Sequence, residues 1–187
     1  MTANHPSTKG LVYTALFGAL TAAGAFIVIP LPPVPITAQT FFLNVAAVLL
    51  GARLGAMSQL IYVLLGVIGI PVFAGGKAGL GVLFGPTGGY LLGFILAAFV
   101  IGMINRMKKN AGVSWNIFSM VIGMLIIYLA GSLQLSLVAK LSFDKALAVG
   151  ALPFIPGDIV KIVLAALVSA RLKDLIKRAY GLDLQMS

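Results

Sequence analysis

Residues 10–52 read GLVYTALFGALTAAGAFIVIPLPPVPITAQTFFLNVAAVLLGA, and none of them carries a charge. A helix needs about 20 apolar residues to cross the hydrocarbon core of a bilayer, so this run is long enough for two helices. The prolines between Pro30 and Pro35 cannot continue a helix, and they divide the run into two segments. We therefore expect one membrane helix over residues 11–29 and a second, shorter one over residues 38–50.

The composition of the whole chain agrees with a membrane location. Of its 187 residues, 60% are hydrophobic and 9% are charged. A typical soluble domain is about 45–50% apolar and about 25% charged. A short chain folded in water exposes a large share of its residues and needs many charged side chains on that surface. Only four residues of this chain are acidic. The composition therefore predicts an all-α integral membrane protein.

The missing residue types exclude several classes of function. Glutamate and cysteine are absent, and the one histidine, His5, precedes the first apolar run. Zinc and haem sites therefore lack most of their usual ligands, and paired-carboxylate hydrolysis would depend on scattered aspartates. The net charge of +9 could suggest nucleic acid, but most basic residues flank apolar runs, as membrane anchors do. We expect no enzyme activity, no metal site and no nucleic-acid partner.

Further apolar runs and turn signals predict four more helices. Residues 51–55, GARLG, predict a tight hairpin after the second helix. The segments on either side of it are short, so both are expected to be tilted or to span the bilayer incompletely. The chain is predicted to form a single six-helix membrane domain over residues 1–187, with disordered-like ends at about 1–9 and 179–187. The other four helices are expected at residues 56–70, 88–104, 115–138 and 156–175.

The basic residues predict the orientation of the bundle, because cytoplasmic loops carry an excess of Lys and Arg. With the N-terminus in the cytoplasm, nine basic residues lie on the inner side and three on the outer side. We therefore expect both termini to be cytoplasmic. The inner residues are Lys9, Arg53, Arg106, Lys108, Lys109, Arg171, Lys173, Lys177 and Arg178, and the outer ones are Lys77, Lys140 and Lys145.

The connection over residues 69–89, GIPVFAGGKAGLGVLFGPTGG, is unusual for an outward-facing loop because it is rich in glycine and nearly uncharged. Non-helical backbone at membrane depth is tolerated only where it is buried in protein or lines a cavity. The loop is expected either to cover a ligand or to seal the outer face of the bundle. A phosphate-binding loop is excluded, because Ala78 follows Gly76-Lys77 where Ser or Thr is required. Phe73, Phe84 and Tyr90 are expected to pack on a ligand ring or to fill the core.

Asp158 and Lys161 are the second candidate feature. They lie three residues apart in the first turns of the last helix, so they share a helix face. Lys161 is surrounded in sequence by apolar residues, and an ionisable residue within a membrane segment marks a functional site by default. The alternative is a structural ion pair that docks the end of the helix. Exposed helical pairs contribute only about 0.3–0.5 kcal/mol, so pairing alone explains such a buried ammonium poorly.

Two smaller patterns lie in the first two helices. Gln39, Thr40 and Asn44 are uncharged polar residues that could line a cavity, or could bond backbone groups near the proline cluster. Ala15, Ala19 and Ala23 recur every four residues and form a face of small side chains, which lets another helix approach closely. Such faces are also common inside helical bundles, so the spacing leaves docking and internal packing equally open.

Several motifs together resemble the BioY family, the biotin-binding membrane subunits of energy-coupling factor (ECF) transporters. The resemblance covers nearly the whole chain. It implies a six-helix substrate-binding subunit in the plasma membrane of a bacterium or archaeon, which captures biotin from outside with high affinity and holds no cofactor. The motifs are GVIGIPVFAGG at residues 66–76, GLG at 79–81, GPTGGYLLGF at 85–94, PFIPGDIVK at 153–161 and the hairpin GARLG at 51–55.

The resemblance also implies ligand-binding residues and partners. Asp158 and Lys161 correspond to the motif of the final helix, Phe73, Gly75 and Gly76 correspond to the loop that lines the pocket, and Tyr90 lies near that loop. The implied partners are a transmembrane coupling protein and two cytoplasmic ATPases. The family's small-residue first helix is implicated in docking the coupling protein, which favours that role for Ala15, Ala19 and Ala23.

The residues also bear on two other functions. A stand-alone facilitator or ion-coupled carrier would need neither ATPase nor coupling protein, but no inverted repeat is evident and only Asp158 lies where it could relay protons. An intramembrane enzyme is disfavoured, because no histidine is embedded and neither Cys nor Glu exists. Uptake by the purified chain alone would favour the carrier.

Overall fold

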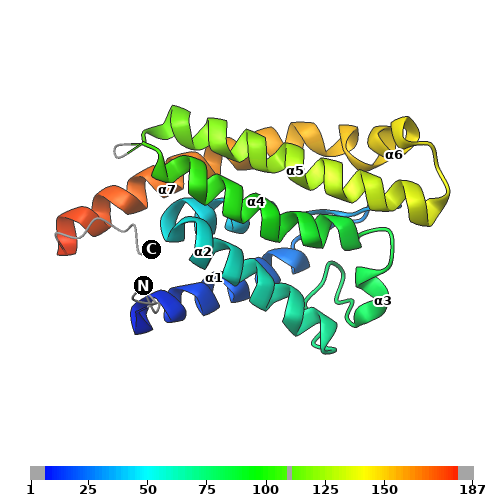
Figure 1. The fold of residues 1–187 in the computed structure, drawn as a ribbon, viewed down its shortest axis with the longest axis horizontal. Helices are drawn as coiled ribbons and strands as arrows, with labels where there is room; N and C mark the ends of the chain where they lie inside the picture. Colours follow the sequence, from blue (N-terminus) through cyan, green and yellow to red (C-terminus); the bar gives the residue numbers. More distant parts are fainter. Residues whose placement is uncertain (1–6, 109–110, 181–187) are drawn as a thin grey trace, which may run out of the picture.

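The computed structural model describes residues 7–108 and 111–180 and shows a bundle of long helices (Figure 1). By length and composition, five helices in this part of the chain could cross a membrane. The expected all-α membrane fold is therefore confirmed. The long helices are α1 (Thr8–Phe26), α2 (Gln39–Val67), α4 (Gly88–Arg106), α5 (Val113–Ala139) and α7 (Ile155–Tyr180). The short elements are β1 (Val28–Ile29), β2 (Ile36–Thr37), α3 (Leu80–Leu83), α6 (Phe143–Gly150) and the 3-10 turn η1 (Leu152–Phe154).

Helix α2 reverses direction at Gly51. The backbone there has φ 79° and ψ −174°, a conformation that glycine adopts without a steric penalty. A Cβ atom on Gly55 would lie 3.0 Å from the Cα of Ala47, and the Gln39 side chain donates to the Tyr62 hydroxyl. The halves 39–50 and 52–67 are therefore antiparallel, which is the hairpin that the sequence predicted. That each half crosses a bilayer stays a prediction.

Several helix ends differ from the sequence-based boundaries. Helix α1 starts at Thr8 and not at residue 11, because the Ser7 hydroxyl accepts a hydrogen bond from the Gly10 amide (3.1 Å) and caps the helix. It ends at Phe26, short of residue 29, because Val28 pairs with Thr37 in an antiparallel ribbon. Helix α7 continues to Tyr180, so only residues 1–6 and 181–187 of the expected irregular ends lie outside the described residues.

The bundle has two distinct ends. Figure 1 shows that α1 begins, α2 reverses and α7 ends at one end, whereas the ribbon, α3 and α6 lie at the other. Arg53 follows the reversal in α2 and Arg106 ends α4, whereas Lys77 precedes α3 and Lys145 lies in α6. This separation agrees with the predicted orientation, and the cytoplasmic location of the first end stays a prediction.

The central helices pack closely because glycines face their neighbours. A Cβ atom on Gly131 of α5 would lie 2.3 Å from the ring of Tyr90 in α4. A Cβ atom on Gly123 would lie 2.4 Å from the side chain of Ile101. Small residues of this kind let membrane helices approach without voids. The α4–α5 contact is therefore too close to accept larger side chains at Gly131 and Gly123.

Candidate functional site

A cavity opens at the end of the bundle that carries the ribbon and the glycine-rich loop. The space free of protein atoms is about 920 Å³, and it includes open solvent at the mouth of the cavity. Its walls come from β2, the start of α2, residues 73–87, and parts of α4, α5 and α7. Most of the wall is apolar, with Phe94, Ile127 and Phe154 among its members. A few polar groups interrupt this lining, and they include the residues that the sequence predicted.

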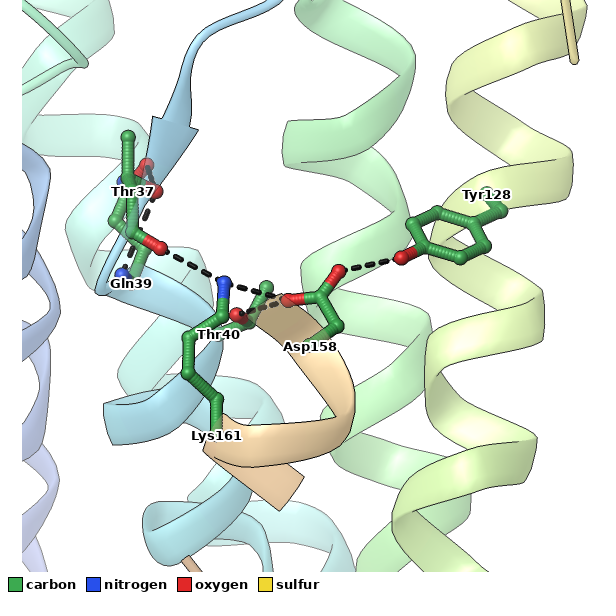
Figure 2. A network of polar contacts seen from close by, with 6 residues as sticks. All are labelled: Thr37, Gln39, Thr40, Tyr128, Asp158 and Lys161. Atoms are coloured by element: carbon green, nitrogen blue, oxygen red, sulfur yellow. Dashed lines mark hydrogen bonds and ion pairs between the residues drawn. The ribbon is translucent and has the colours of Figure 1, made fainter. Parts of the chain in front are cut away.

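Asp158 and Lys161 face this cavity as an ion pair. Lys161 Nζ lies 2.5 Å from Asp158 Oδ1, and it donates a second bond to the backbone carbonyl of Thr37 (2.9 Å). Figure 2 shows the ammonium between the β2 carbonyl and the carboxylate. The pair therefore ties the start of α7 to the ribbon. An ammonium has three donors, so one remains for a ligand.

The Asp158 carboxylate is held by further donors. Thr40 Oγ1 donates to Oδ1 (3.2 Å), and the Tyr128 hydroxyl donates to Oδ2 (2.5 Å) (Figure 2). Asp158 is 5% exposed. A carboxylate has about four lone-pair positions, and Lys161, Thr40 and Tyr128 occupy three of them. The carboxylate is therefore rigidly placed, and it can accept one more hydrogen bond from the cavity.

The two buried amides predicted to line a cavity do so, but in different ways. The Gln39 oxygen accepts from the Thr37 hydroxyl (2.9 Å), and its nitrogen donates to Tyr62. Gln39 is thus committed to the scaffold. Asn44 is 5% exposed, borders the cavity, and makes no side-chain hydrogen bond within the described part of the chain. Its amide is therefore available to a ligand in the cavity.

The glycine-rich loop forms one wall of the cavity. Phe73 is 1% exposed, and its ring packs edge-on against Tyr62 at 5.7 Å. The Phe73 amide donates to the Lys77 carbonyl (3.0 Å), which closes a tight turn. Gly75 and Gly76 occupy that turn with φ of 71° and 73°, and they do not border the cavity. Their role in the structure is to shape the turn, whereas Phe73 supplies the wall.

Tyr90 combines the two roles that the sequence left open. Its ring borders the cavity and packs over Gly131. Its hydroxyl donates to the Gly150 carbonyl (2.8 Å), which fixes the end of α6 over α4. Phe84, in contrast, is 74% exposed and lies outside the cavity wall. Tyr90 is therefore an apolar wall residue with a structural hydroxyl.

Sequence reasoning missed three contributors to the site. Tyr128 was not selected, although a phenol in the middle of an uncharged helix was a usable signal. Thr37 contributes its backbone carbonyl, which side-chain patterns do not reveal. Lys77 was treated as a loop charge, but it borders the cavity. Thr37 and Lys77 become recognisable only in the folded structure, where the ribbon and the loop border the same cavity as α7.

The small-residue face lies on the outside of the bundle. Ala15, Ala19 and Ala23 are all exposed, whereas Thr14 and Thr21 face inward. Both threonine hydroxyls bond to carbonyls one turn earlier in α1. An exposed row of alanines leaves space for a helix from another chain. Docking at this face stays a prediction.

Comparison with known proteins gives consistent likenesses along the chain. The model of the BioY family matches residues 1–178. The biotin transporter BioY of Thermotoga maritima is 47% identical over 167 residues, 89% of this chain and 97% of that protein. The biotin transporter BioY of Rhizobium etli is 44% identical over 171 residues, 86% and 91% of the two chains. A crystal structure of the S-component for biotin from an ECF-type ABC transporter matches with a TM-score of 0.83 and 29% identity, over 89% of this chain and 91% of that chain.

These likenesses agree with the helical bundle and with the motifs around its cavity. The relatives are named as transporters, and the solved structure is a transporter component, so the chain is a multi-pass membrane transport protein and not an enzyme. The family model spans both the glycine-rich loop and the Asp158–Lys161 motif. The chain therefore belongs to the BioY family.

Proposed function

We propose that this chain binds biotin in the outer-end cavity and serves as the high-affinity capture subunit of a vitamin importer. One observation carries the proposal: an ion pair without net charge, Asp158–Lys161, and the available amide of Asn44 line a cavity that is otherwise largely apolar. The names of the relatives support biotin as the ligand. The solved S-component supports the same assignment.

The polar groups of the cavity complement the ureido ring of biotin. That ring has two N–H donors and one carbonyl acceptor and is uncharged. Asp158 has one lone-pair position left, and Lys161 has one N–H left. Asn44 offers both a donor and an acceptor. Hydrogen bonds to the charged pair are roughly twice as strong as bonds between neutral groups, so a few of them can hold a neutral head group.

Energy for transport is proposed to come from other chains. The sequence has no phosphate-binding loop, so ATP hydrolysis would be supplied by two cytoplasmic ATPases through a transmembrane coupling protein. The exposed alanine face of α1 is the proposed contact with that protein. In this arrangement the chain lies in the plasma membrane of a bacterium or archaeon, with the cavity facing outward and both termini in the cytoplasm. The ligand would enter from outside.

The binding half of the proposal is tested by titration of the detergent-purified chain with labelled biotin, with thiamine and riboflavin as competitors. We expect binding that biotin alone displaces. Asp158→Asn and Lys161→Met should each weaken binding strongly, whereas Asp144→Asn, an exposed aspartate on α6, should not. Wild-type affinity in both site variants would remove the assignment.

The coupling half is tested separately by uptake into proteoliposomes. We expect uptake only when the coupling protein, the ATPases and ATP are present with the chain. Rapid uptake by the chain alone, without ATP, would contradict the coupled mechanism and support a stand-alone facilitator or ion-coupled carrier. The binding titration is unaffected by that outcome, so the two halves can fail independently.

A further inference from the structure

The cavity wall has more positive than negative charge. Among the described residues that border it, the charged ones are Lys77, Asp158 and Lys161. Asp158 and Lys161 form an ion pair, and no salt bridge involves Lys77 within the described part of the chain. The wall therefore has one cation that the protein leaves unbalanced. A ligand that complements this wall has a neutral polar part and one negative charge.

Lys77 is held at the mouth of the cavity by its backbone. Its carbonyl accepts from the Phe73 amide (3.0 Å), and Phe73 is packed under the loop against Tyr62. Two residues later, the Gly79 amide donates to the Gly66 carbonyl (2.7 Å), which anchors the turn to the end of α2. Lys77 itself is exposed, unlike the nearly buried Asp158. The side chain of Lys77 is thus exposed, while its backbone is fixed by the turn.

Lys161 is poorly suited to bind an anionic group. Its ammonium lies 2.5 Å from Asp158, so a ligand carboxylate placed on it would also lie close to a second carboxylate. Like charges at such separations repel, and the repulsion is strongest where water is excluded. Lys77 has no carboxylate partner within the described residues, so it can receive an anion without this repulsion.

We propose that Lys77 binds the carboxylate of the ligand's tail, while the Asp158–Lys161 pair and Asn44 bind its neutral head. This inference rests on the proposed function, because it fixes which end of biotin lies deep and which lies at the mouth. It also defines the ligand class: an uncharged, hydrogen-bonding ring on an apolar chain that ends in a carboxylate. Lys77 then acts as the residue that distinguishes the acid from its neutral derivatives.

The test is a set of titrations of the full chain in detergent with biotin and with neutral biotinamide. Four proteins are compared at low salt: wild type, Lys77→Met, Lys77→Arg and the control Lys145→Met, which removes an exposed lysine at the same end. We expect wild type to prefer biotin by about fivefold, in line with an exposed ion pair. Lys77→Met should lose that preference yet bind biotinamide as wild type does, whereas Lys77→Arg and Lys145→Met should keep it.

Salt provides a second readout, because it screens exposed charges. The preference of wild type for biotin should shrink as salt is raised, and the affinity of Lys77→Met should be nearly independent of salt. The inference is overturned by equal wild-type affinities for acid and amide, by a preference that survives in Lys77→Met, or by loss of biotinamide binding in that variant. Failure of wild type to bind biotin at all would instead refute the proposed function.

Discussion

Removing one member of the Asp158–Lys161 pair is expected to lower the free energy of unfolding more than removing both. Lys161→Met leaves the Asp158 carboxylate with two neutral donors, Thr40 and Tyr128. Asp158→Asn leaves the ammonium with the neutral carbonyl of Thr37 and an amide. An uncompensated charge left by breaking a buried pair typically costs about 3–5 kcal/mol. The Lys161 side chain is 18% exposed, so we expect about 3 kcal/mol for each single variant, at the lower end of that range.

The double variant Asp158→Asn/Lys161→Met has no buried charge left. Thr40 and Tyr128 donate to different oxygens of Asp158, so only one of them can still donate to the new amide oxygen, and the other hydroxyl must accept from the amide nitrogen. The remaining loss is one of hydrogen-bond strength and not of charge balance. For a chain of this size, about 3 kcal/mol lowers the midpoint of thermal unfolding by about 6–12 °C. Each single variant should show a decrease of this order, and the double variant should show a smaller one.

The assay is thermal unfolding of the purified variants in detergent, with a biotin titration of each. Asp144→Asn/Lys145→Met serves as the matched control, because both residues are exposed on α6 at the same end of the bundle. Decreases that simply add up in the double variant would refute the view of the pair as one electrostatic unit. Recovery of biotin binding in the double variant would refute direct contact between these groups and the ligand.

Three further changes test other parts of the structure. Asn44→Leu should weaken biotin binding about tenfold without lowering stability, because the Asn44 amide has no hydrogen-bond partner within the described residues. An unchanged affinity in the biotin titration would contradict this prediction. Gly131→Ala should abolish or greatly reduce the yield of folded protein in size-exclusion chromatography, because the new Cβ would lie 2.3 Å from the Tyr90 ring. A normal yield would show that α4 and α5 can separate. Ala19→Leu should leave biotin binding intact but reduce ATP-driven uptake with the coupling module, so unchanged uptake would exclude docking at that face.

The helical framework was predictable because membrane insertion acts on local sequence. Charge-free runs, the proline cluster and Gly51 located the helices and the hairpin from their own residues. The ends of α1 differ from the predicted ones because the Ser7 cap sets its start and the two-residue ribbon that follows sets its end. The short helix α6 escaped prediction since it lies between two longer apolar segments and has no span of its own.

The sequence predicted only those site residues whose side chains differ clearly from their apolar neighbours. Asp158 and Lys161 stand out in an apolar helix, and Gln39 and Asn44 stand out in another. The sequence does not show that the Gln39 amide is hydrogen-bonded within the protein and the Asn44 amide is not. That difference depends on Tyr62 and Thr37, which lie elsewhere in the sequence. The glycines at positions 75 and 76 illustrate the reverse case. Their positive φ angles explain why glycine is needed there, without any contact to the cavity.

A charged pair, in place of neutral polar residues, suits the proposed binding of a neutral ligand head within a membrane protein. A single buried charge would be costly to desolvate and would select an oppositely charged ligand. Neutral side chains would avoid that cost but form weaker hydrogen bonds. Asp158 and Lys161 together supply charge-assisted donors and acceptors with no net charge, and Thr40, Tyr128 and the Thr37 carbonyl hold them in place. In the proposed binding mode, the surplus charge on Lys77 lies at the exposed mouth of the cavity, where the ammonium stays hydrated until the ligand carboxylate binds.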